Sequence, residues 1–123
     1  MTLVGIAVAG ALGALARYGL QGLVADRVGA GFPWGTFVVN VSGAFVLGLL
    51  FTLLTERFTT DPSLRTSLTV GFLGAYTTFS TLTLETYRLL EDGALVSAAG
   101  NLLGSCAAGM LAIYLGIVLG RVL

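Results

Sequence analysis

Long apolar stretches separated by short polar connections dominate the chain. Each of four such stretches is poor in charge and long enough to cross the ~30 Å hydrocarbon core of a bilayer as a helix of ~20 residues. Because the connections are short, consecutive spans should be antiparallel neighbours, with no extramembrane domain. The pattern predicts a single all-α transmembrane domain over residues 1–123, with spans at about 3–24, 34–55, 66–90 and 94–120.

Composition supports a membrane protein and argues against an enzyme. The 123 residues are 56% hydrophobic and 10% charged, with a mean hydropathy of +0.97, which lies outside the range of soluble domains of this size. Histidine is absent and acids are few, which excludes most metal sites and most acid–base catalysis. The first apolar stretch lacks a basic leading region, so we expect a span there and no cleavable signal peptide. The lone Cys106 is expected to be a small buried residue of the fourth span.

The arginines divide evenly between the two sides of the predicted four-span topology. One side carries Arg57, Arg65 and Arg121, and the other carries Arg17, Arg27 and Arg88. The positive-inside rule therefore gives no preferred orientation. Insertion in both orientations, followed by assembly of an antiparallel dimer, is one explanation. A single orientation fixed by other signals is the alternative.

A cluster of hydroxyl side chains interrupts the third apolar stretch. Within seven positions the cluster holds Thr77, Thr78, Ser80, Thr81 and Thr83. β-Branched threonines close to glycines weaken a helix, and a broken backbone at membrane depth must be buried in protein or line a polar cavity. The pattern favours a break around Gly74–Thr77, whose freed carbonyls would suit a small cation while the next half-helix presents N–H groups to an anion. A continuous helix with threonines bonded to their own carbonyls is the alternative.

Single polar residues in the other spans are further candidates. Arg17 ends a series of small residues at four-residue intervals, and it either faces an anion, a partner or water, or extends to the lipid headgroups. Asn40 lies seven positions into the second span and needs a hydrogen-bond partner, either another helix or a solute. In the fourth span, Ser105 ends a polar stripe that either packs helices or lines a pathway. Beside this stripe, Gly100 and Gly104 have the spacing of a helix-packing face.

Three segments together resemble one known family. They are GALGALARY at residues 10–18, GTFVVNVSG at 35–43 and GFLGAYTTFST at 71–81. They resemble the Fluc (CrcB-type) fluoride channels, and the resemblance covers nearly the whole chain in length, span number and order. It implies four-helix subunits that form an antiparallel, dual-topology homodimer in a bacterial or archaeal plasma membrane. Two pores in such a dimer let fluoride leave the cytoplasm passively.

The resemblance also assigns roles to particular residues. It implies that Gly74 and Thr77 of both subunits offer backbone carbonyls to a central structural sodium ion. Asn40, Phe79 and Ser105 match residues of the family's pore. The Thr81 hydroxyl adds a donor, and Arg17 is the remaining candidate for the fluoride pathway.

Two positions depart from the family's pattern, and two other functions compete with the channel. Leu82 stands where the family usually has a second phenylalanine, and Asn101 stands at the usual tyrosine position. A small dual-topology, proton-coupled multidrug exporter has similar length, but it needs a membrane-embedded carboxylate. In this chain, Glu85 lies close to a span end, at a spacing that permits pairing with Arg88. A structural membrane subunit without transport would explain the small-residue stripes and leave the polar cluster unexplained.

Overall fold

The computed structural model describes all residues 1–123 and contains helices but no strands. The α-helices are α1 (Thr2–Val28), α2 (Trp34–Thr52), α3 (Pro62–Thr66), α4 (Gly74–Tyr76), α5 (Phe79–Glu91) and α6 (Leu95–Val122). Two π-helical segments, η1 (Leu53–Arg57) and η2 (Ser67–Leu73), extend α2 and join α3 to α4. Three helices, α1, α2 with η1, and α6, are long and apolar enough to cross a membrane. The prediction of an all-α membrane protein is confirmed.

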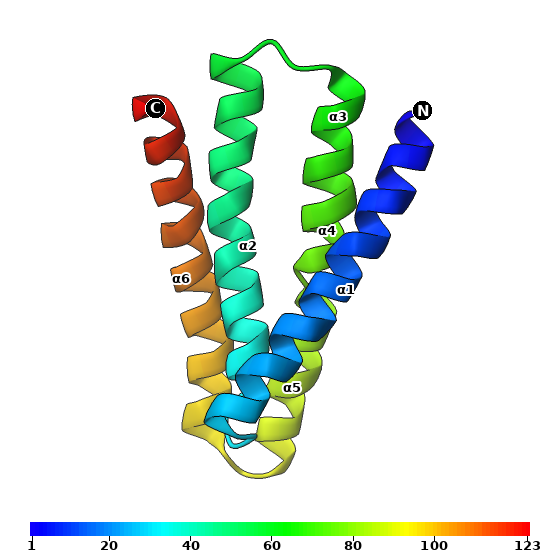
Figure 1. Ribbon diagram of the computed structural model, residues 1–123. Helices are drawn as coiled ribbons and strands as arrows, with labels where there is room; N and C mark the ends of the chain where they lie inside the picture. The colour runs from blue at the N-terminus through cyan, green and yellow to red at the C-terminus, as the bar shows by residue number, and fades with distance from the viewer.

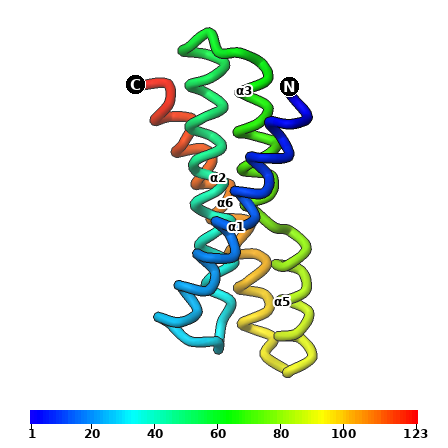
Figure 2. Tube along the Cα trace, turned by 45° about the vertical axis from the view of Figure 1, so that its right-hand side comes forward, coloured from blue at the N-terminus to red at the C-terminus, as the bar shows by residue number.

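The helices form an elongated bundle with both chain termini at the same end (Figure 1). Helices α1 and α3–α5 run in one direction, and α2 and α6 run in the other. The third apolar stretch is built from α3, η2, α4 and α5 in succession, so it is divided and not one continuous helix. Figure 2 shows the change of direction between its upper part and α5.

The break in the third stretch lies slightly later than the sequence predicts. Gly74 remains helical, with φ −64° and ψ −35°, so the prediction that unwinding begins at Gly74 is wrong. The backbone becomes extended at Thr77 (φ −82°, ψ 155°) and Thr78 (φ −148°, ψ 114°). β-Branched side chains favour extended backbone. The Thr78 hydroxyl also caps α5 by accepting a 3.2 Å bond from the Thr81 N–H, so the break is confined to these two threonines.

The closest helix contact joins α2 to α6 through glycines. A Cβ atom added to Gly48 would meet the Ile113 carbonyl oxygen, and one added to Gly116 would meet the Phe45 carbonyl oxygen and lie 2.9 Å from the Leu49 nitrogen. Only glycine permits backbones this close. The two helices run in the same direction, so the tightest packing joins alternate spans and not the consecutive antiparallel neighbours that short connections suggested.

A similar contact joins α1 to η2, again between segments that run in the same direction. A Cβ on Gly13 would meet the Phe72 carbonyl oxygen, and one on Gly71 would lie 3.0 Å from the Ile6 carbonyl oxygen. Gly5 faces the Ser67 hydroxyl in the same way. The small-residue face predicted for the first span is therefore a packing face within the subunit.

The small residues of α6 behave differently from the prediction. Added Cβ atoms on Gly100, Gly104 and Gly109 would meet nothing within 4 Å, so these glycines make no close contact with another helix of the chain. Cys106 is exposed, and the prediction that it is buried is wrong. The reason is rotational: α6 turns Gly116 and Gly120 toward α2, while Gly100 and Cys106 lie on its exposed face.

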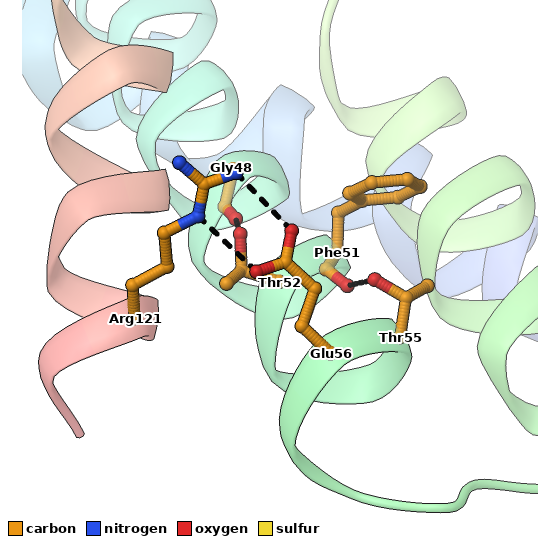
Figure 3. Close-up of polar contacts among 6 residues, drawn as sticks. All are labelled: Gly48, Phe51, Thr52, Thr55, Glu56 and Arg121. Atoms are coloured by element: carbon orange, nitrogen blue, oxygen red, sulfur yellow. Dashed lines mark hydrogen bonds and ion pairs between the residues drawn. The ribbon is translucent and has the colours of Figure 1, made fainter.

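An ion pair closes the end of the α2–α6 contact that lies near the C-terminus (Figure 3). Arg121 donates from Nε to Glu56 Oε2 at 3.1 Å and from one terminal nitrogen to Oε1 at 3.3 Å. Beneath it, Thr52 and Thr55 donate to the carbonyls of Gly48 and Phe51, four residues earlier. This end of the bundle is therefore held by local bonds and one surface ion pair.

Candidate functional site

Asn40 is bonded to the backbone at the break. Its Nδ2 donates to the Thr78 carbonyl at 3.0 Å, and its Oδ1 accepts from the Thr78 N–H at 2.7 Å. The carboxamide thus replaces both backbone partners that Thr78 loses when the helix opens. Since Thr78 is 6% exposed, water could not easily take that role. One N–H of the Asn40 amide is left over for a further partner.

The first turn of α5 gathers hydroxyls beside this bonded pair. The Thr78 hydroxyl donates to Thr81 Oγ1 at 3.0 Å and lies 3.3 Å from the Ser80 hydroxyl. These side chains surround the amino-terminal end of a helix, where unpaired N–H groups and the helix dipole favour negative charge. Three of the five hydroxyls of the predicted cluster, those of Thr78, Ser80 and Thr81, therefore form one connected group at the start of α5.

The other side of the break packs against α2. Thr77 donates its hydroxyl to the Leu73 carbonyl at 3.0 Å, and its methyl group lies against Gly43. Tyr76 shares a 2.9 Å hydrogen bond with Ser42, so the first residue of the break and the residue before it both contact α2. The geometry of the break depends on α2 as much as on its own sequence.

An open groove of about 890 Å³ leads from one end of the bundle to the start of α5. It is bounded by the end of α1, the α1–α2 connection, the start of α2 and one face of α5. Its polar lining includes Gln21, Thr36, Thr81, Glu85, Arg88 and Asp92. Because Thr81 also bonds Thr78, the groove connects the outside of the bundle with the break.

A hydrogen-bond chain across three helices crosses this groove. Gln21 Nε2 donates to Thr36 Oγ1 at 3.0 Å, and Thr36 donates to Glu85 Oε1 at 2.7 Å. Glu85 makes no ion pair with Arg88, so the predicted pairing of these residues is wrong. The α2–α5 packing brings the Thr36 hydroxyl to the carboxylate. Glu85 Oε2 is buried without a hydrogen-bond partner in the chain.

A second polar group lies between α5 and α6. Asn101, fully buried, donates from Nδ2 to the Thr86 hydroxyl at 2.9 Å. Ser105 lies one turn further along α6 and is 6% exposed. Leu82 is 5% exposed, so this departure from the family's pattern is a core residue of the subunit.

Other predicted site residues face outward or stand apart. Phe79 is 72% exposed, and Gly74 is also on the subunit surface. Arg17 is half-buried, makes no hydrogen bond or ion pair within the chain, and does not line the groove. The structure thus brings Asn40 and Thr81 together at the break, while Phe79 and Gly74 lie on the outer surface around it.

Sequence reasoning missed Gln21 and Thr36 as members of the groove. Thr36 precedes Asn40 by four residues, so both lie on one face of α2, and that spacing was a usable signal. Gln21 gave no such signal, because its partner is on another helix. The assembled site offers many neutral donors close to a helix amino terminus, a chemistry that suits a small anion.

Comparison with known proteins gives one consistent answer. A family model described as "CrcB-like protein, Camphor Resistance (CrcB)" matches residues 4–117. A fluoride-specific ion channel FluC of Geotalea daltonii is 48% identical over 120 residues, covering 98% of this chain and 97% of the relative. That of Geobacter metallireducens is 50% identical over 121 residues, covering 98% of each. That of Magnetococcus marinus is 46% identical over 123 residues and covers both chains completely.

Proposed function

The chain belongs to the CrcB-like protein family, and on this basis we propose that it is a fluoride-selective ion channel. The observation that carries the proposal is similarity along essentially the whole chain to relatives named fluoride-specific ion channels. Those relatives are channels and not enzymes, so this multi-pass membrane protein is not an enzyme. Its relatives are bacterial, and we place it in a bacterial plasma membrane, where it lets fluoride leave the cytoplasm down its gradient.

The polar groove and the start of α5 form the proposed fluoride pathway. Moving a carboxylate-sized ion into a medium of low dielectric constant costs an idealised figure of about 20 kcal/mol, and the smaller fluoride ion costs more. Thr81, the spare N–H of Asn40, Ser105 and the positive edge of the Phe79 ring replace the lost water. Arg17 attracts the anion from outside the groove. Many weak neutral contacts permit exit as well as entry.

The exposed position of Gly74, close to the break, supports an antiparallel homodimer with two pores and a central sodium ion. Gly74 lies on the subunit surface, and a Cβ added there would meet only the Thr69 carbonyl oxygen, at 3.9 Å. Thr77, three residues later, has extended backbone. Backbone oxygens are ligands that suit a hard monovalent cation, and no cluster of acidic, histidine or cysteine side chains offers another site. The carbonyls of Gly74 and Thr77 from two copies would hold the ion, whose charge would tie the two breaks together.

Fluoride flux from liposomes tests the channel. Purified protein should release fluoride, measured with a fluoride electrode, and should release no chloride. Asn40→Asp should lower the flux sharply, because it removes the amide donors and puts negative charge beside the path. A chain that moves both halides equally, or none, is not a fluoride channel.

A matched pair of threonines tests the route. Thr81→Val removes a hydroxyl from the groove lining, and Thr83→Val removes an exposed hydroxyl that bonds only the Ser80 carbonyl. Fluoride flux should fall for Thr81→Val and stay near the wild-type rate for Thr83→Val. Equal effects of the two substitutions would exclude the groove as the path.

Sodium dependence tests the cation and the dimer. The melting temperature of the purified protein should be higher in sodium than in choline at equal ionic strength, because only sodium fits a carbonyl site. Cross-linking of one surface position in opposite leaflets should capture an antiparallel pair. An equal melting temperature in sodium and in choline would contradict the structural cation, but it would not contradict the channel activity.

A further inference from the structure

Ser105 differs from the other buried hydroxyls of this chain, all of which make a hydrogen bond. A serine or threonine inside a helix usually bonds the carbonyl four residues earlier. Six residues do so here: Thr52, Thr55, Ser67, Thr69, Thr77 and Thr86. The Ser105 hydroxyl is buried and has no hydrogen-bond partner in the chain. It is therefore a free donor inside the protein.

The orientation of the Asn101 amide is fixed by its neighbour. The Thr86 hydroxyl donates its only proton to the Leu82 carbonyl at 2.8 Å, so toward Asn101 it can only accept. Asn101 must then turn its NH₂ group to Thr86 and its Oδ1 the other way. This oxygen is buried and unpartnered in the chain. A free acceptor therefore accompanies the free donor on α6.

Asn101 Oδ1 and the Ser105 hydroxyl are close neighbours, but they do not form a hydrogen bond with each other. Asn101 and Ser105 are four residues apart on one helix, where Cβ atoms are about 5–6 Å apart. No hydrogen bond joins their side chains. Both side chains are more than nine-tenths buried, at 0% and 6% exposed. Two buried polar groups placed in this way call for a shared third partner.

The required chemistry selects that partner. It must accept a proton from Ser105 and donate one to Asn101 Oδ1. Fluoride can accept from Ser105 but cannot donate to Asn101 Oδ1, whereas water can do both. We propose that one water molecule binds between Asn101 Oδ1 and Ser105 Oγ at the α5–α6 contact. Buried waters of this kind make two to four hydrogen bonds to groups that otherwise lack partners.

The bound water would also change what Asn101 presents to an anion, an extension that rests on the proposed function. A bare Oδ1 repels fluoride. A water that donates one hydrogen to Oδ1 keeps its second hydrogen for another acceptor, so the pair becomes a donor. Asn101 thus acts as a positioning residue through the water, at the position where the family usually has a tyrosine hydroxyl. Ser105 also serves the pathway through this water, because its only proton is donated to the water and not to fluoride directly.

Thermal unfolding in detergent tests the site, because the direction in which Ser105→Ala shifts the melting temperature depends on whether a water is bound. If Ser105 holds a water, Ser105→Ala should lower the melting temperature by a few degrees, because Asn101 Oδ1 loses its bridge. If Ser105 is an unsatisfied hydroxyl, the same substitution should raise the melting temperature or leave it unchanged, because alanine is the better helix former. Ser97→Ala, on the same helix with a half-buried side chain, is the control and should be neutral.

A crystal structure that resolves ordered solvent gives the direct observation. Density within hydrogen-bond distance of both Asn101 Oδ1 and Ser105 Oγ is expected in the wild-type protein and should be absent in Ser105→Ala. If the wild-type protein shows no density at this place, the proposed water site is wrong. This test uses the wild-type protein, so it does not depend on whether Asn101→Leu folds.

Flux separates the pathway role from the site itself. Fluoride efflux should fall several-fold for both Ser105→Ala and Asn101→Leu, and the double variant should be no slower than the slower single variant, because both remove the same water. Additive losses, or wild-type flux in both single variants, would overturn the pathway role. Failure of the wild-type protein to conduct fluoride would instead refute the proposed function and leave the water site standing.

Discussion

The α2–α6 contact and the break beside Asn40 hold the same bundle together in opposite ways. Gly48 and Gly116 bring two backbones into direct contact, and no side-chain hydrogen bond joins α2 to α6 in that region. At the break, Asn40 supplies two directed hydrogen bonds to Thr78. The first region should tolerate changes of polarity better than changes of volume, and the second should do the reverse. A membrane protein can therefore carry a rigid packed half and a polar, divided half in one small chain.

Asn40→Leu should give the largest loss of stability. Leucine has the same branching at Cγ as asparagine but no polar atoms, so it leaves the N–H and carbonyl of Thr78 unpaired in a buried place, at about 1–3 kcal/mol for each group. Ser42→Ala, also on α2, removes one bond to Tyr76 and should cost about 1 kcal/mol. Thermal unfolding in detergent compares them. Equal losses for the two variants would mean that Asn40 does not hold the break.

Gly116→Ala should come next, at about 1–3 kcal/mol, a typical cost of overpacking. The added methyl group would meet the Phe45 carbonyl oxygen and the Leu49 nitrogen, both rigid backbone atoms. Gly109→Ala adds the same methyl group on the same helix where nothing lies within 4 Å. Melting temperatures should separate the pair clearly. If the two variants have the same melting temperature, the α2–α6 contact is looser than its glycines indicate.

Thr36→Val should cost less, about 1 kcal/mol, which is the net value of an ordinary hydrogen bond. It breaks the chain from Gln21 to Glu85, but the open groove lets water reach both freed groups. Unfolding measurements on Thr36→Val, Gln21→Leu and the double variant form a cycle. Simple additivity would show that the three residues do not act as one chain.

The Arg121–Glu56 pair should have the smallest effect. Its side chains are 61% and 43% exposed, and ion pairs of this kind are weakened by solvent and salt. Arg121→Gln should lower the melting temperature slightly at low ionic strength and not at all at high ionic strength. A large effect that persists in concentrated salt would mean that packing of the arginine stem, and not charge, holds this end.

The site was predicted unevenly from the sequence. The hydroxyl cluster after Gly74 indicated a break because a lipid-facing helix has no use for five hydroxyls, and the break exists. Its position at Thr77 and Thr78 depends on Asn40. This residue lies on another helix, α2, and its side chain replaces the backbone partners that Thr78 has lost. Periodicity along one helix contains no information on such a partner, so the extent of unwinding was misplaced at Gly74.

Contacts between helices were the least predictable part. The expected pair of Glu85 with Arg88 follows from spacing on one helix, but α2 brings the Thr36 hydroxyl to the carboxylate instead. The spacing of Gly100 and Gly104 resembles that of Gly116 and Gly120, yet only the latter pair contacts α2. Spacing defines a face of a helix, and the rotation of the helix in the bundle decides which face is used.

The sequence by itself determined the all-helical class, the membrane character and the family, because apolar length and local motifs are properties of continuous segments. The tertiary structure decided which glycines meet backbone, where the third helix opens, and that Asn101 and Ser105 have no partners in the chain. These features depend on the rotation and proximity of separate helices. Hydrogen bonds and close contacts act over only a few ångströms, so they are fixed only once the helices have packed.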